Sequence, residues 1–75
     1  MHSDQIVTFL DLAESRSFHR TADRMGLTQS TVSARIAGLE SALGTRLFTR
    51  SRAGADLTTE GLKFAPHARA LRHAY

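Results

Sequence analysis

A group of mostly short, hydrogen-bonding side chains stands near the start of residues 27–44, a segment with helical periodicity. On a helix, one face would carry Gln29, Ser30, Ser33, Ala34 and Arg35. Hydroxyl and amide groups donate and accept hydrogen bonds, and a guanidinium pairs with anions. The sequence therefore predicts a helix with one face that contacts a polar surface.

The opposite face of this segment is apolar, and it explains why the segment should fold as a helix. Its hydrophobic residues recur at spacings of four, three and four: Val32, Ile36, Leu39 and Leu43. This spacing places them on one buried stripe. Thr28 is the expected N-cap, and Gly44 is expected to end the helix in a left-handed conformation.

The segment before it also has helical spacing, and only a short turn separates the two. Phe18, Ala22 and Met25 share one face, and Gly26 permits the positive φ of a turn. The small Ala22 lets the second helix approach closely, and Val32 is expected to pack between the two helices. These spacings predict a helix-turn-helix.

The helix-turn-helix and the residues after it resemble a known family. The resemblance rests on LTQSTVSARIAGLESALGTRLFTR and LTTEG, residues 27–50 and 57–61. They are similar to the N-terminal DNA-binding domain of LysR-type transcriptional regulators, and the similarity covers nearly the whole chain. It implies a winged helix-turn-helix, a linker helix that forms a homodimer, and an effector-binding domain beyond Tyr75. We therefore expect part of a longer regulator, with no cofactor and with any small-molecule effector bound by the missing domain.

The resemblance also implies roles for residues of the polar face. Gln29, Ser30 and Ser33 are expected to face bases and phosphates, because Gln can pair with adenine and Ser hydroxyls can serve either group. Thr28 and Thr31 are expected to support contacts with the DNA backbone.

Two positions depart from the family pattern. The family often has arginine where Ala34 stands, whereas here the arginine is Arg35, about a third of a turn further round the helix. Arg50, in the Leu-Phe-x-Arg run, matches the family's backbone-contacting arginine at the wing, and the second wing arginine lies unusually near, at Arg52. We expect both shifts to alter the base preference and to preserve the binding mode.

Positive charge gathers in the second half of the chain. Nine Arg and one Lys stand against seven acids, for a net charge of +3. Residues 41–55 and 61–75 each carry three of these basic residues and no acid. Because the planar arginine fork pairs bidentately with phosphate, the composition suits phosphate recognition. The resemblance implies that the partner is double-stranded DNA. The alternative is a basic face that is merely solvated.

Composition also argues against other classes of protein. The chain has no cysteine, so it has no disulfide, thiol nucleophile or thiolate metal ligand. Its four histidines lack the spacing of a metal-binding pair, so we expect neither an enzyme nor a metal site. No apolar run approaches the ~20 residues of a membrane span, and the N-terminus is unlike a signal peptide. We expect a cytoplasmic, nucleoid-associated protein with no membrane partner.

Two further helices are predicted before the helix that carries the polar face. An apolar stripe marks the first helix: Ile6, Phe9, Leu10 and Ala13. Ser3 or Asp4 can cap the first helix, and Ser17 can cap the second. His19 and Arg20 lie near the start of the second helix, which in this motif crosses the DNA backbone. They are candidate phosphate contacts, with plain solvent exposure as the alternative.

A two-stranded hairpin, or wing, is predicted within residues 46–57. Leu47 and Phe48 supply apolar side chains for it, and Gly54 supplies the turn. Thr58 is then expected to cap a fourth helix.

The last helix carries an apolar stripe at spacings of three and four: Leu62, Ala65, Ala68, Leu71 and Tyr75. We expect that this stripe has no cover within so small a domain and packs against its copy in a second chain. The alternative is packing within one chain. Pro66 predicts a kink or a restart of the helix.

Together these patterns predict a mainly all-α fold, with a three-helix core, a short two-stranded wing and a C-terminal linker or dimerisation helix. We expect a winged helix-turn-helix over residues 1–58 and the linker helix over 59–75. The predicted function is sequence-specific binding of DNA by a homodimeric transcriptional regulator. Helix 28–43 would lie in the major groove, and the wing arginines would contact phosphates. The alternative is a helical protein-interaction module with an incidental basic face.

Overall fold

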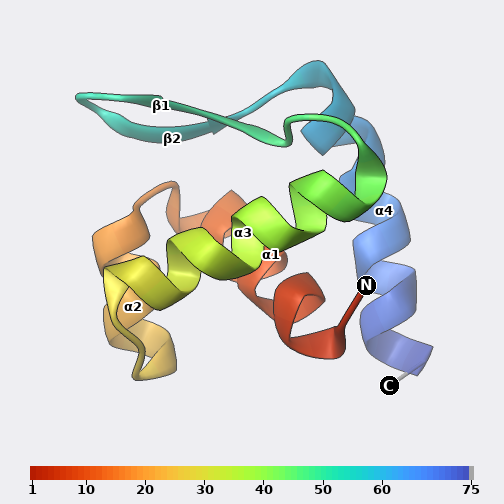
Figure 1. The fold of residues 1–75 in the computed structure, drawn as a ribbon, viewed down its shortest axis with the longest axis horizontal. Helices are drawn as coiled ribbons and strands as arrows, with labels where there is room; N and C mark the ends of the chain where they lie inside the picture. Colours follow the sequence, from red (N-terminus) through yellow and green to blue (C-terminus); the bar gives the residue numbers. More distant parts are fainter. Residues whose placement is uncertain (75) are drawn as a thin grey trace.

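The structure, a computed structural model, describes residues 1–74. Four helices and one hairpin follow in the order α1 (Ser3–Ser15), α2 (Phe18–Met25), α3 (Gln29–Leu43), β1 (Phe48–Ser51), β2 (Gly54–Leu57) and α4 (Thr59–Ala74). α3 crosses over α1, with α2 near its N-terminal end and α4 toward its C-terminal end (Figure 1). The hairpin extends from the end of α3 back along the molecule. The predicted winged helix-turn-helix is confirmed.

One hydrophobic core joins these elements, and α2 contributes to it through the half-buried Phe18. The largest fully buried members of the core come from α1, α3 and the base of the wing: Ile6, Phe9, Leu12, Leu39, Leu47 and Phe48. The ring centroid of Phe9 lies 5.4 Å from that of Phe48 and 5.2 Å from that of Phe64 on α4. Both ring pairs are tilted or edge-on, the arrangement that aromatic quadrupoles favour. Phe9 therefore ties the wing and α4 to α1.

The ends of the helix-turn-helix form as the sequence predicts. The Ser17 hydroxyl accepts a hydrogen bond from the Arg20 amide at 3.1 Å, and Thr28 caps α3 in the same way. Gly26 and Gly44 end their helices at φ 67° and 70°, in the left-handed region that glycine enters without steric cost. The turn is thus specified by its local residues.

Two expectations about helix ends are wrong. The N-cap position of α1 is occupied by His2 rather than by Ser3 or Asp4, which lie inside the helix. The Gln5 side chain accepts a hydrogen bond from the His2 amide at 2.9 Å. Leu43 is 37% exposed, although it continues the buried stripe of α3. It is the last residue of the helix and lies at the edge of the core, where it lines an open hollow beside Leu47.

The wing is an antiparallel pair in which Phe48 faces Leu57, Arg50 faces Ala55 and Ser51 faces Gly54. Two residues, Arg52 and Ala53, form its tip. The Thr58 hydroxyl accepts a hydrogen bond from the Gly61 amide at 3.0 Å, so Thr58 caps α4 as predicted.

α4 differs most from expectation. Ala65 and Ala68 are 9% and 0% exposed and belong to the core, so the prediction that the whole stripe lacks cover within the chain is wrong. Their small side chains let α4 pack directly against α1. Leu62 is 62% exposed, Leu71 is half-buried, and Tyr75 lies outside the described residues. α4 continues through Pro66 as one helix, so no restart occurs.

Candidate nucleic-acid interface

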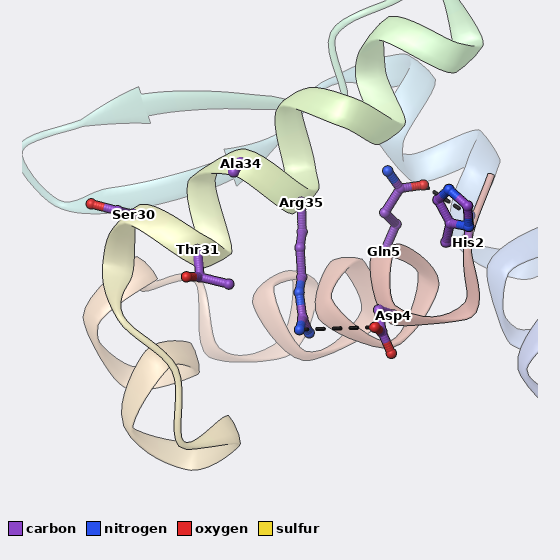
Figure 2. A pocket seen from close by; sticks show the side chains of 7 residues that line it. All are labelled: His2, Asp4, Gln5, Ser30, Thr31, Ala34 and Arg35. Carbon is purple, nitrogen blue, oxygen red and sulfur yellow. Dashed lines mark hydrogen bonds and ion pairs between the residues drawn. The ribbon is translucent and has the colours of Figure 1, made fainter.

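The N-terminal turn of α3 presents the predicted polar face to solvent. Thr28, Gln29, Ser30 and Ala34 are exposed, and Thr31 is half-buried. Figure 2 shows Ser30 and Ala34 pointing away from α1, whereas Thr31 points toward the side of α1 and α2. The Thr31 hydroxyl accepts a hydrogen bond from the Thr28 hydroxyl at 3.0 Å. The outward part of this face therefore consists of Gln29, Ser30 and Ala34.

Arg35 does not lie on that outward face, and this corrects the prediction. Its side chain extends toward α1 (Figure 2), where one terminal nitrogen lies 3.9 Å from a carboxylate oxygen of Asp4. The other donates to the Thr8 hydroxyl at 3.4 Å, and the Arg35 side chain is only 27% exposed. Because successive residues differ by about 100° on a helix, a shift of one place from Ala34 turns the arginine inward. Arg35 connects α3 to α1.

The wing reaches α3 through Arg50. The Arg50 guanidinium donates to the Ser33 hydroxyl on α3 at 2.9 Å, and its central carbon lies 4.0 Å from the centre of the Phe18 ring on α2. Arg50 and Arg52 are both exposed. The polar end of α3 and the basic side of the wing thus form one continuous surface.

His19 lies beside the first residue of α3. Its Nδ1 is 3.4 Å from the Gln29 side-chain nitrogen, and its Nε2 is 3.3 Å from a carboxylate oxygen of Asp23. An imidazole that is protonated only at Nε2 donates to Asp23 and accepts from Gln29. Arg20 is exposed on the same helix. The structure therefore brings His19 next to Gln29, which the sequence spacing did not reveal.

A carboxylate that the sequence analysis missed attaches the wing to α3. Oε2 of Glu40 accepts hydrogen bonds from the amides of Leu47 and Phe48 at 2.7 and 3.2 Å. The same oxygen lies 3.5 Å from Nε of Arg46, and the Glu40 side chain is 14% exposed. An acid near a helix C-terminus interacts unfavourably with the helix dipole. This unfavourable position is the feature of the sequence that could have indicated a separate role for Glu40.

A second attachment comes from Arg16, in the two-residue connection between α1 and α2. Arg16 adopts φ 58°, and its carbonyl accepts a hydrogen bond from the Ala55 amide of β2 at 2.9 Å. Its guanidinium pairs with Asp56. A Cβ on Gly54 would lie 2.2 Å from the Arg16 carbonyl oxygen, so glycine is required where the hairpin approaches. The wing is held from both sides.

Among residues 1–74, no three His, Cys, Asp or Glu side chains gather into a group that could hold a metal ion. None of the described helices is long and apolar enough to cross a membrane.

Comparison with known proteins agrees with this architecture. Residues 3–62 match the model of a family described as bacterial regulatory helix-turn-helix proteins, lysR family. The chain belongs to the LysR family. This LysR-family model describes regulatory proteins, not enzymes.

Among curated LysR-family relatives, the HTH-type transcriptional regulator HdfR of Salmonella typhimurium is 44% identical over 75 residues. The match covers 100% of this chain and 27% of HdfR, so the chain spans about a quarter of the relative's length.

Solved LysR-type structures share the fold closely. A CbnR DBD–DNA complex is 30% identical with a TM-score of 0.95, and the match covers 99% of this chain and 85% of that one. A BenM DBD in complex with catB site 1 DNA is 31% identical with a TM-score of 0.88, covering 95% and 80% of the two chains. Both are structures of complexes with DNA.

Proposed function

We propose that this chain binds double-stranded DNA as the DNA-binding domain of a transcriptional regulator, with the start of α3 in the major groove. The observation that carries this proposal is the bond from Arg50 to Ser33, which joins the exposed polar end of α3 to the wing. An α-helix fits the major groove, and basic groups beside it meet the phosphates. The DNA complexes of similar domains support the same assignment.

The residues of this surface divide by chemistry. Gln29 is the proposed base-reading residue, because its amide can pair bidentately with adenine. Ser30 and Ser33 hydroxyls serve bases or phosphates, and the Thr28 backbone lies at the helix N-terminus, where amides favour phosphate. Four exposed side chains beside α3 or on the wing are proposed to contact phosphates: Arg50, Arg52, Arg20 and His19. Such contacts add affinity with little sequence preference.

We further propose that two chains associate through α4. Leu62 is a large apolar side chain at 62% exposure, whereas Leu71 lies about half a turn round the helix from it and packs against the core of its own chain. Ala65 and Ala68 are also buried within the chain, so the proposed contact uses the side of α4 that carries Leu62. A two-fold dimer would bind DNA sites with two related halves.

Selection of bound duplexes from a random-sequence DNA pool tests the proposal. We expect enrichment of a motif with two-fold related halves. Recovery of DNA without enrichment would contradict base reading by α3. No recovery at low salt would contradict DNA binding altogether and favour the alternative, a helical module that binds protein.

A further inference from the structure

The guanidinium of Arg50 is held by two neutral groups from two different helices. Its central carbon lies 4.0 Å from the centre of the Phe18 ring, and one terminal nitrogen donates to the Ser33 hydroxyl at 2.9 Å. The cation faces the electron-rich side of the ring, an arrangement that attracts it electrostatically. A long, exposed side chain that would otherwise sample many rotamers thus has a defined position.

The nature of these partners matters for phosphate binding. Ion pairs elsewhere in residues 1–74 join Arg16, Arg24, Arg35 and Arg46 to carboxylates, whereas none joins Arg50 to one. A carboxylate would orient the guanidinium but would also cancel its charge. A ring and a hydroxyl orient it and leave the charge available to an anion.

The position of Phe18 allows its ring to hold the Arg50 guanidinium in a defined orientation. It is the first residue of α2, directly after the Ser17 cap, and its half-buried ring packs against the hydrophobic core. The core restrains the ring, and the exposed guanidinium lies over it. The cap, the core and the wing arginine are therefore linked through one aromatic side chain.

We propose that Phe18 is a positioning residue that orients Arg50 toward a DNA phosphate without neutralising it. This inference rests on the proposed DNA binding. Immobilising a rotamer-rich side chain on binding costs about 0.5–1.5 kcal/mol, which corresponds to about two- to tenfold in affinity. An arginine that is already oriented avoids part of that loss.

The test is a double-mutant cycle with the 75-residue chain and a mixed-sequence DNA duplex, titrated at several salt concentrations. Phe18→Leu should weaken binding about two- to tenfold with an unchanged salt slope, because the phosphate contact remains but is less preorganised. Phe18→Tyr keeps the ring and should bind like the original chain. Arg50→Ala should reduce the log–log salt slope by about 0.9. In the Arg50→Ala background, Phe18→Leu should have no further effect.

Three outcomes of the double-mutant cycle would overturn the proposal. Equal weakening by Phe18→Leu in both backgrounds would show a purely structural role, and no weakening would show no role. An Arg50→Ala variant with unchanged affinity and salt slope would refute the wing contact itself, and with it any positioning by Phe18. NMR of the unsubstituted chain gives a further check if Phe18→Leu fails to fold. The Arg50 side-chain protons should be shifted by the ring current, and ordinary shifts would refute the stacking.

Discussion

Removing the Glu40 carboxylate should loosen the wing and destabilise the domain. In Glu40→Ala, the amides of Leu47 and Phe48 lose their acceptor at the start of β1, where both residues are buried. An orphaned buried donor costs about 1–3 kcal/mol, so two donors with partial access to water should cost about 2–4 kcal/mol together. For a domain of this size each kcal/mol lowers Tm by about 4–8 °C.

Thermal and urea unfolding followed by circular dichroism would measure this loss. Glu40→Gln retains an oxygen acceptor and should cost only about 1 kcal/mol, because the bonds lose their charge assistance. Arg46→Ala is a second control, since the Arg46 side chain is 70% exposed and surface ion pairs contribute about 0–1 kcal/mol. A Glu40→Ala variant as stable as the original chain would refute the reasoning. Water would then satisfy both amides, and the wing would not depend on Glu40.

Three further predictions concern other parts of the domain. Gln29→Ala should relax base preference at one position in each half-site and cost about 1–3 kcal/mol on the preferred sequence, as competition binding would measure. An unchanged preference would remove Gln29 from base reading. Leu62→Asp should release monomers in sedimentation experiments, without loss of folding, because Leu62 is 62% exposed in the single chain. A dimer that persists would locate the contact elsewhere. Gly61→Ala should lower Tm despite the ~1 kcal/mol gain in helix propensity, because the new Cβ would lie 2.3 Å from the Leu47 carbonyl oxygen.

The elements that local sequence specifies were predictable. Caps, left-handed glycines and hydrophobic spacing each depend on residues within a few positions of one another, so Ser17, Thr28, Gly26 and Gly44 were assigned correctly. The hairpin was predictable for the same reason.

Contacts between distant segments were not predictable. Whether Arg35 faces a partner or α1 depends on the helix phase at a single position and on Asp4 and Thr8, which lie in another helix. The apolar spacing of α4 does not distinguish a stripe that packs on α1 from one that packs on a second chain. Ala65 and Ala68 were misassigned on that account.

The two attachments of the wing also determine its mechanics. Glu40 holds the start of β1, and the Arg16 carbonyl holds β2 at Ala55, so the free part of the hairpin is little more than its tip. A hairpin that is fixed close to its tip moves little, because the displacement of the tip increases steeply with the length of the free segment. Arg50 lies beside the fixed part and should keep a constant distance from α3. In the proposed complex, Arg52 at the tip would be able to follow the DNA backbone. One arginine on the fixed part of the hairpin and one on its movable tip would let the same domain bind DNA grooves of different widths, if the proposed function holds for both.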